Sequence, residues 1–146
     1  MESSAASQAK ILAITPDETL AKVISDALSR RGLQVALAPG SGEGLRKAES
    51  RDFDLILLDL ALKDMNPLEL LSRTKEASPQ SIVFILAASP SVDSAVEALR
   101  RGAFDYLIWP VPDEEMIRRV ESALQTRRLG EVRRRTAEEL QHEKVR

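Results

Sequence analysis

The residues most able to do chemistry in this chain are four aspartates around one apolar run. Asp52 and Asp54 come before the run "LILL", Asp59 follows it directly, and Asp64 comes later in the next loop. Clustered carboxylates are the ligands that Mg²⁺ and Ca²⁺ take in proteins. The two ends of one strand lie at opposite edges of a sheet, so Asp52 and Asp54 cannot join Asp59. We therefore interpret these acids as polar residues that flank a strand, and not as a metal cluster.

Thiol, histidine and nucleotide chemistry find little support in the sequence. The chain has no cysteine, which removes disulfides, thiolate nucleophiles and cysteine-based metal sites. His142 is the only histidine and lies among charged residues, and a lone histidine makes neither a metal site nor a catalytic triad. The stretch "PGSGEG" at 39–44 lacks the pattern of a nucleotide-binding loop, so we interpret it as a loop that leads into a helix.

The apolar pattern alternates between short dense runs and longer stretches with a helical period. Dense runs predict strands over residues 10–15, 33–38, 53–60, 81–88 and 104–109. Helical spacing predicts helices over residues 17–32, 41–51, 66–78, 91–102 and 112–146, the last with an interruption at Gly130. This alternation predicts a doubly wound α/β fold, in which a parallel sheet carries helices on both faces.

The carboxyl ends of the predicted strands gather the candidate site residues at one edge of the sheet. Ligands of doubly wound sheets bind at this edge, near the point where the strand order reverses. Four strand ends carry residues 15–17, 59–63, 87–90 and 109–110. Trp109, the only tryptophan, therefore lies where a ligand or a reaction centre is expected, and its bond to Pro110 can be cis.

Length and composition fit one domain with a polar leader. The chain has 146 residues, of which 43% are hydrophobic and 30% charged, and its net charge is −2. These values are ordinary for a globular domain and do not indicate nucleic acid as a partner. No apolar run approaches the roughly 20 residues that span a bilayer. Residues 1–8 are expected to be a disordered leader without a signal-peptide core, so we expect a cytoplasmic protein with no membrane partner.

Three stretches give the chain a family likeness. "ILAITPDETL", "FDLILLDLALKDMNPLELL" and "SVDSAVEALRRGAFDYLIWPV" resemble the receiver domain of bacterial two-component response regulators. The part from 91 to 107 is especially similar to receivers of multidomain transcription activators. The resemblance covers residues 9–126. It implies a flavodoxin-like (βα)5 sheet with strand order 2-1-3-4-5, followed here by an extended C-terminal helix.

The resemblance also implies a chemistry and a site. In the family, the aspartate that ends the third strand takes a phosphoryl group from a histidine kinase. Two acids after the first strand help to hold Mg²⁺, which offsets the charge of the phosphoryl group and its acceptor. A Thr or Ser that ends the fourth strand donates to the phosphate, and a lysine that ends the fifth strand pairs with it. On this sequence the phosphoacceptor position falls on Asp59.

The other positions of that site carry residues that cannot do the family's chemistry. The acid pair falls on Thr15 and Pro16, with Asp17 one residue late. The hydroxyl position falls on Ala87, and the lysine position falls on Trp109. The losses are mutually consistent, because a pocket without the acid pair no longer holds carboxylates that repel one another and need a cation.

Four more residues complete this degenerate pocket and the face beside it. Lys63 stands where the family has a proline, and it could supply a cation. Tyr106 matches the aromatic residue of the family's switch, and with Ser89 and Pro110 it belongs to the switch and output face. The ring of Trp109 either partly covers the vacated pocket, which we favour, or packs on the surface near Pro110.

Three hypotheses follow for function. The first is an atypical receiver, not an enzyme, that acts by protein–protein contacts largely without phosphorylation and needs no cofactor. The second is a phosphoacceptor receiver, phosphorylated on Asp59 by a histidine kinase, in which Asp17 helps to bind Mg²⁺ weakly and an output domain controls transcription. The third is an unrelated doubly wound enzyme or nucleotide binder. We favour the first because the pocket has lost its acids, its donor and its cation together.

One face and the C-terminal residues predict the partners. The output face, made by the fourth helix, fifth strand and fifth helix, keeps the family's pattern and predicts a homodimer. Residues 127–146 are expected to be a helical linker, or a coiled coil toward an output domain absent from this chain. A weak heptad stripe supports the coiled coil, at Leu129, Val132, Thr136 and Leu140. The basic run at 133–135 lacks aromatic or motif support, so we expect no direct contact with nucleic acid.

Overall fold

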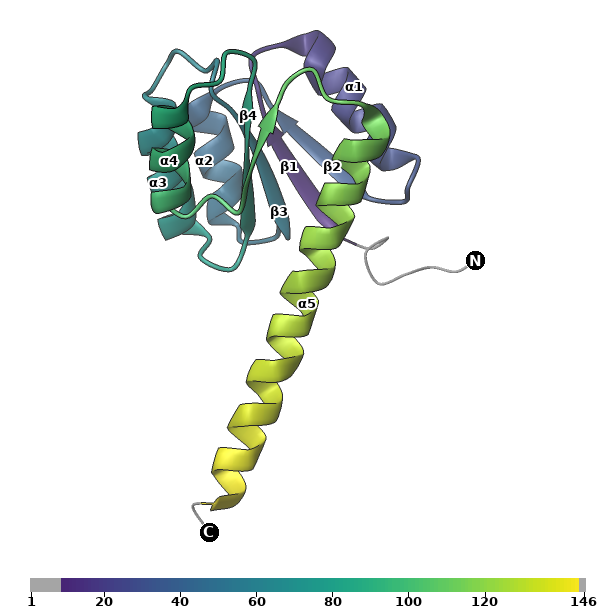
Figure 1. Ribbon diagram of the computed structural model, residues 1–146, viewed down its shortest axis with the longest axis vertical. Coiled ribbons are helices and arrows are strands. Elements are labelled where there is room, and N and C mark those ends of the chain that lie inside the picture. The colour runs from purple at the N-terminus through teal and green to yellow at the C-terminus, as the bar shows by residue number, and fades with distance from the viewer. Residues whose placement is uncertain (1–8, 145–146) are drawn as a thin grey trace.

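A five-stranded parallel sheet forms the centre of the protein (Figure 1). The computed structural model describes the backbone of residues 9–144 and the side chains of residues 9–129. The strands are β1 (Lys10–Ile14), β2 (Gln34–Ala38), β3 (Leu55–Asp59), β4 (Ile82–Ala87) and β5 (Asp105–Ile108). They lie in the order β2-β1-β3-β4-β5. The doubly wound fold and its strand order are confirmed.

The two central strands are the most deeply buried elements. Every residue of β3 and of β4 is buried, because helices cover both faces of the sheet at these strands. This burial explains why both strands appear in the sequence as continuous apolar runs without alternation. The strand register pairs Ile14 with Leu58 and Asp59 with Leu86, so the carboxyl ends of β1, β3 and β4 lie together.

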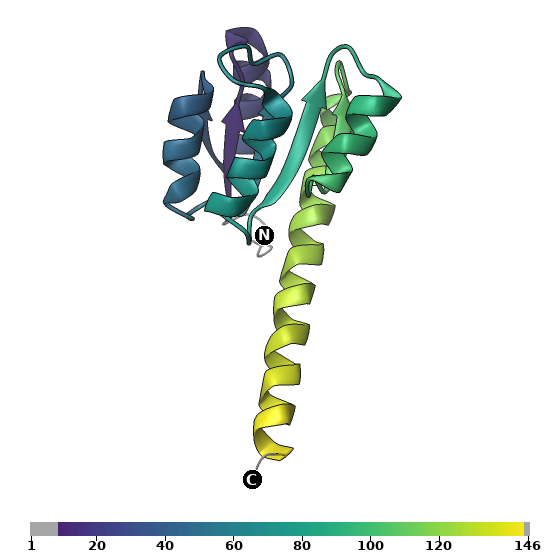
Figure 2. The same ribbon diagram turned by 90° about the vertical axis from the view of Figure 1, so that its left-hand side faces the viewer.

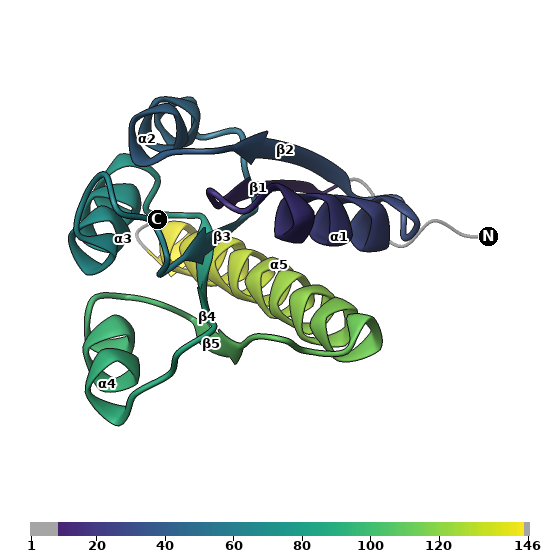
Figure 3. The same cartoon turned by 90° about the horizontal axis from the view of Figure 1, so that it is seen from above.

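Helices form a layer on each face of the sheet (Figure 3). One layer is α1 (Glu18–Ser29) with α5 (Asp113–Lys144), and the other is α2 (Ser41–Glu49), α3 (Pro67–Ala77) and α4 (Val92–Arg100). The first layer covers an apolar cluster that contains Ile24 and Val120, and the second covers a cluster that contains Leu70 and Leu71. Among the described residues of α4, only Ala98 is buried. This helix therefore contacts the sheet over a narrow area.

Side chains cap the first turns of three helices. The cap bonds run from Leu20 N to Asp17 Oδ1 (3.1 Å), from Leu68 N to Asn66 Oδ1 (2.9 Å) and from Ser94 N to Ser91 Oγ (3.1 Å). Each bond satisfies a backbone N–H that has no partner within the helix. Gly32 and Gly102 follow α1 and α4 with φ of 84° and 106°, a left-handed conformation that favours glycine.

The last helix is much longer than the others. α5 extends well beyond the end of the sheet (Figure 2). The predicted interruption at Gly130 is wrong, because the helix continues through this residue. One glycine in a helix costs only about 1 kcal/mol relative to alanine, and arginine and glutamate around it are good helix formers. Neither α5 nor any other helix in the described part of the chain is long and apolar enough to cross a membrane.

Candidate functional site

The candidate residues at the carboxyl ends of β1 and β3 meet at one edge of the sheet. These strands pair in a register that brings Ile14 beside Leu58, and Thr15 and Asp59 come directly after them. The strand order reverses here, since β2 lies on one side of β1 and β3 lies on the other. Doubly wound sheets bind their ligands at such a point. The structure therefore brings Thr15 and Asp59 together where the sequence places a functional site.

A buried hydrogen bond joins Thr15 to Asp59. The Thr15 hydroxyl donates to Asp59 Oδ2 at 2.7 Å, and the two residues are only 3% and 4% exposed. The backbone N–H of Ala61 donates to the other oxygen, Asp59 Oδ1, at 2.8 Å. A buried carboxylate is costly unless its oxygens accept hydrogen bonds. Both oxygens of Asp59 are therefore engaged by donors that the protein itself supplies.

The loop after β1 fixes the direction of the Thr15 hydroxyl. A hydroxyl has one proton to donate and also accepts hydrogen bonds. The backbone N–H of Asp17 donates to Thr15 Oγ1 at 3.1 Å, while the hydroxyl proton is directed to Asp59. Sequence reasoning treated Thr15 only as a lost acid and missed this bond. The signal was a threonine that follows the strand next to the one that ends in Asp59.

The acids around this pair do not assemble into a metal site. The Asp17 carboxylate caps α1 by accepting from Leu20 N at 3.1 Å, and Pro16 has no side-chain ligand atom. Within the described residues, no group of three or more acidic or histidine side chains could hold a metal ion. The site therefore offers one buried carboxylate, Asp59, where the metal site implied by the resemblance uses three.

Ala87 and Trp109 lie at the ends of β4 and β5. Ala87 is buried and has no hydroxyl to donate, and its carbonyl accepts from the backbone N–H of Trp109 at 2.8 Å. The half-buried ring of Trp109 packs against the apolar cluster beneath α1 and α5, and the bond to Pro110 is cis. The favoured interpretation, in which this ring also covers the pocket at Asp59, stays a prediction.

The remaining candidates lie in exposed loops or on the neighbouring face. Lys63, Ser89 and Pro110 are exposed, and each lies in the loop that follows its strand. Tyr106 is half-buried on β5, and its hydroxyl shares a hydrogen bond of 2.6 Å with Ser94 Oγ on α4. Sequence reasoning missed Ser94, because a helical pattern does not show which polar residue faces the neighbouring strand.

Asp64 has a role that the sequence did not reveal. Its carboxylate accepts from the Ser41 hydroxyl at 2.6 Å and from the Ser41 backbone N–H at 2.9 Å. These two hydrogen bonds hold the pKa of Asp64 below its ordinary value. Gly40, the N-cap residue of α2, has no side chain to accept from the first turn, so Asp64 serves this end of the helix from another loop. Describing Asp64 as a flanking polar residue was therefore incomplete.

A comparison with protein families decides what this domain is. Residues 11–121 match the family model of the response regulator receiver domain. The chain belongs to this family. The family assignment drawn from three stretches of sequence is therefore confirmed, and this receiver has the parallel sheet and strand order that the resemblance implied.

Curated relatives of this receiver are transcriptional regulatory proteins. The transcriptional regulatory protein ZraR of Klebsiella oxytoca is 36% identical over 124 residues, which cover 85% of this chain and 28% of ZraR. The alginate biosynthesis transcriptional regulatory protein AlgB of Pseudomonas putida is 29% identical over 130 residues, which cover 89% of this chain and 29% of AlgB. The receiver thus spans less than a third of the length of these relatives.

Solved structures share the fold of this receiver. A CheY-like receiver domain protein from Methanospirillum hungatei superposes with a TM-score of 0.81 at 27% identity, covering 84% of this chain and 98% of that one. NtrX from Brucella abortus, solved in complex with ADP, has a TM-score of 0.79 at 27% identity, covering 84% of this chain and 28% of NtrX.

Proposed function

We propose that this receiver is an atypical signalling module that acts through protein–protein contacts, largely without phosphorylation of Asp59. The observation that carries the proposal is the buried hydrogen bond from Thr15 to Asp59 Oδ2 at 2.7 Å. A carboxylate oxygen attacks phosphorus with a lone pair, and a hydrogen bond to that oxygen withdraws charge from it and makes it a weaker nucleophile. Here one oxygen holds the Thr15 hydroxyl and the other holds the N–H of Ala61.

The electrostatics of the pocket support the same proposal. Phosphoryl transfer depends on positioned cations and donors that stabilise the charge of the transferring group. A hydroxyl such as that of Thr15 is a neutral donor, which can satisfy one carboxylate but cannot offset an incoming phosphoryl group as well. Pro16, Ala87 and Trp109 supply neither a metal ligand, a hydroxyl nor a charge. We therefore expect this receiver to need no Mg²⁺ and no other cofactor.

An apolar stripe on α4 supports a contact surface. Val92, Val96 and Leu99 follow the spacing of one helical face and are 78%, 46% and 53% exposed. Ile108, on the neighbouring strand β5, is 55% exposed. Apolar side chains that gather on a surface in this way mark an interaction site. This stripe lies on the face where the sequence predicts a homodimer.

We assign a second copy of this chain as the occupant of the stripe. A two-fold symmetric contact uses the same patch on both subunits, so its charges must be able to pair with themselves. Both signs occur on α4, at Asp93, Glu97, Arg100 and the helix-capping Arg101, of which Glu97 and Arg101 already form an ion pair of 2.8 Å within the chain. The face thus carries an apolar centre and charges of both signs, which suits contact with its own copy.

The alternative is a receiver that is phosphorylated on Asp59 by a histidine kinase and controls a transcriptional output domain. Two observations favour it. Asp59 is retained at the end of β3. A response regulator from Burkholderia pseudomallei, 30% identical with a TM-score of 0.72 over 90% of this chain and 75% of that one, was solved with a phosphorylated aspartic acid and a calcium ion.

A Mg²⁺ titration distinguishes the two functions. Trp109, the only tryptophan, reports on the carboxyl edge of the sheet by its fluorescence, and calorimetry reports binding wherever it occurs. The atypical receiver should show neither signal up to about 10 mM Mg²⁺, well above the range of specific cation sites. Saturable binding that Asp59→Asn abolishes would support the phosphoacceptor.

A further inference from the structure

We propose that Arg127 sets the direction in which α5 leaves the domain, so that the receiver and its projecting helix move as one rigid body. The inference goes beyond the proposed function and does not depend on whether Asp59 is phosphorylated. It rests on where Arg127 lies. The apolar contacts of α5 with the sheet end at Leu124, the last buried residue among the side chains described. Arg127 lies one turn further on, at the edge of the sheet opposite the Thr15–Asp59 pair.

Arg127 connects the helix to three parts of the domain at once. Its Nη1 donates to Asp54 Oδ1 at 2.7 Å, just before β3, and its Nε donates to the carbonyl of Gln80, just before β4, at 2.8 Å. Asp54 in turn accepts from the backbone N–H of Lys10, the first residue of β1, through Oδ2 at 2.9 Å. The planar guanidinium holds both acceptors in a fixed geometry, which a flexible ammonium group would not do.

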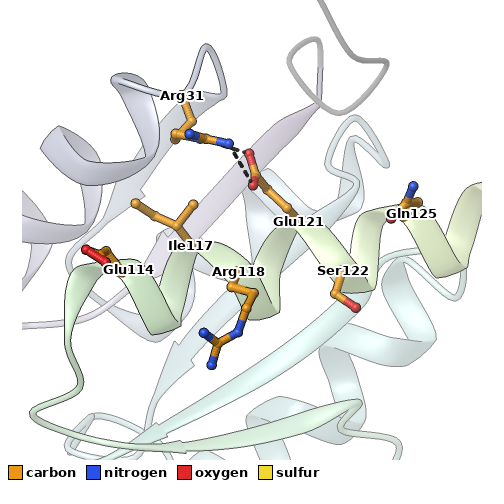
Figure 4. A pocket seen from close by; sticks show the side chains of 7 residues that line it. All are labelled: Arg31, Glu114, Ile117, Arg118, Glu121, Ser122 and Gln125. Carbon is orange, nitrogen blue, oxygen red and sulfur yellow. Dashed lines mark hydrogen bonds and ion pairs between the residues drawn. The ribbon is translucent and has the colours of Figure 1, made fainter.

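Two other arginines hold α5 closer to its start. Arg31, just after α1, binds both oxygens of Glu121 on α5, at 3.1 and 3.2 Å (Figure 4). Arg119 on α5 binds both oxygens of Asp105 on β5, at 2.9 and 2.6 Å. These pairs fix the helix to its neighbours on two sides. The Arg30–Asp113 pair at 3.5 Å and the buried side chains from Met116 to Leu124 hold the same part of the helix, so none of these contacts holds it where it leaves the sheet.

Among the described side chains, Arg127 supplies the last fixed point of the helix, at the place where it leaves the sheet. It lies about two turns beyond the other two pairs, at the point where the helix leaves the sheet. From there to Lys144 the helix runs for a further 17 residues, or about 25 Å at 1.5 Å per residue. A tilt of about 10° at the anchor would move the far end by about 4 Å over that length. A small loosening at Arg127 would therefore become a large displacement of whatever the helix holds or contacts.

Distance measurements between two spin labels test this role. The chain has no cysteine, so labels can be placed at Glu76→Cys on α3 and at Glu139→Cys on the projecting helix without removing native thiols. Glu76 is exposed and lies outside the contacts of α5. Arg127→Met removes the guanidinium but keeps an apolar stem, and Arg128→Met is the matched control at an exposed neighbour on the same helix. Helical content by circular dichroism is read in parallel.

Each doubly labelled chain is diluted into excess unlabelled chain, so that a dimer adds no distances between subunits. The expected result is then a narrow distance distribution in the parent and in Arg128→Met. Arg127→Met should broaden that distribution at least two-fold while helical content stays the same, which separates a change of direction from a loss of helix. Asp54→Asn, which weakens the same pair from the other side, should broaden it less. The proposal is overturned if Arg127→Met keeps the narrow distribution or if Arg128→Met broadens it equally. Should Arg127→Met fail to fold, a narrow distribution in Asp54→Asn overturns it instead.

Discussion

Thr15, just after β1, donates a buried hydrogen bond of 2.7 Å to Asp59, the last residue of the neighbouring strand β3, so a hydroxyl donor stands where the receiver family carries an acid. The bond gives the retained aspartate a structural role. Asp59 links the loop after β1, through Thr15, with the loop after β3, through the N–H of Ala61. Its presence in a pocket that has lost the other parts of the site therefore does not require that it be phosphorylated.

Removing the Thr15 hydroxyl should destabilise the fold. Thr15→Val keeps the shape of the side chain but leaves a buried carboxylate oxygen without its donor, which typically costs about 1–3 kcal/mol. The measurement is the free energy of unfolding in urea. Thr126→Val is the control, because Thr126 is exposed and also β-branched, and its change should stay within about 0.5 kcal/mol. If the two variants lose the same free energy of unfolding, the Thr15–Asp59 hydrogen bond contributes little to stability.

Trp109 should stabilise the domain through its packing against the cluster beneath α1 and α5. Because the ring is half-buried, Trp109→Ala should cost about 2 kcal/mol, less than the roughly 3–5 kcal/mol of a fully buried aromatic side chain. Leu129→Ala, at a side chain that is 53% exposed beyond the sheet, should cost well below 1 kcal/mol. If the ring also covers Asp59, then Asp59→Asn should shift the emission of Trp109. An unchanged emission spectrum would restrict the ring to the cluster.

The free energy of unfolding of the domain should fall at acid pH through Asp64, which lies in the loop after β3. The two bonds from Ser41 lower the pKa of Asp64 in the folded state below the ordinary value of 3.8. Its contribution to stability is therefore present above that value and lost as the pH falls through the lower, folded pKa. Asp64→Asn should flatten the loss of stability in this range, measured by unfolding in urea at a series of pH values.

A charge in the apolar stripe of α4 should prevent association. We expect Val96→Asp to give a monomer at about 100 μM, a concentration at which pairs with a Kd of about 10 μM associate. Sedimentation velocity measures this, and the parent chain should sediment as a dimer. Leu37→Asp is the control, since Leu37 is partly exposed on β2, away from α4. A parent chain that is already monomeric would contradict the homodimer.

The fold could be predicted because its signals are local. Apolar runs at β3 and β4, and glycines after α1 and α4, mark the elements within a few residues. The interruption expected at Gly130 does not occur, because one glycine lowers helix propensity without ending a helix whose leucine, arginine and glutamate neighbours favour it. Asp59 and Trp109 could be singled out as site candidates because strand ends share one edge of a parallel sheet.

The partners of the site residues could not be predicted in the same way. Thr15 and Asp59 are 44 residues apart, and Ser41 and Asp64 are 23 apart, so each bond exists only once the strands and loops are packed. The sequence at these positions shows only what the residues lack relative to a family pattern. It does not show what the residues present do for one another, which depends on rotamers and loop paths.

The charge arrangement of the site can be rebuilt as a reference for phosphorylation. The variant Thr15→Asp, Pro16→Asp, Trp109→Lys restores two acids and a cation around Asp59, and should recover Mg²⁺ binding at about 10 mM. Trp109→Lys alone should not, because it adds a cation without the metal-binding acids. If the triple variant folds but does not bind Mg²⁺, these residues do not surround Asp59 as inferred.

Intact-mass spectrometry after incubation with acetyl phosphate and Mg²⁺ tests the central claim most directly. We predict that the parent chain gains no phosphoryl group, because the Thr15 hydroxyl and the Ala61 N–H each withdraw charge from an oxygen of Asp59 and no cation offsets the incoming charge. The triple variant, treated in the same way, shows whether the reagent is competent. A stoichiometric phosphoryl adduct on the parent chain that is absent from Asp59→Asn would contradict the account.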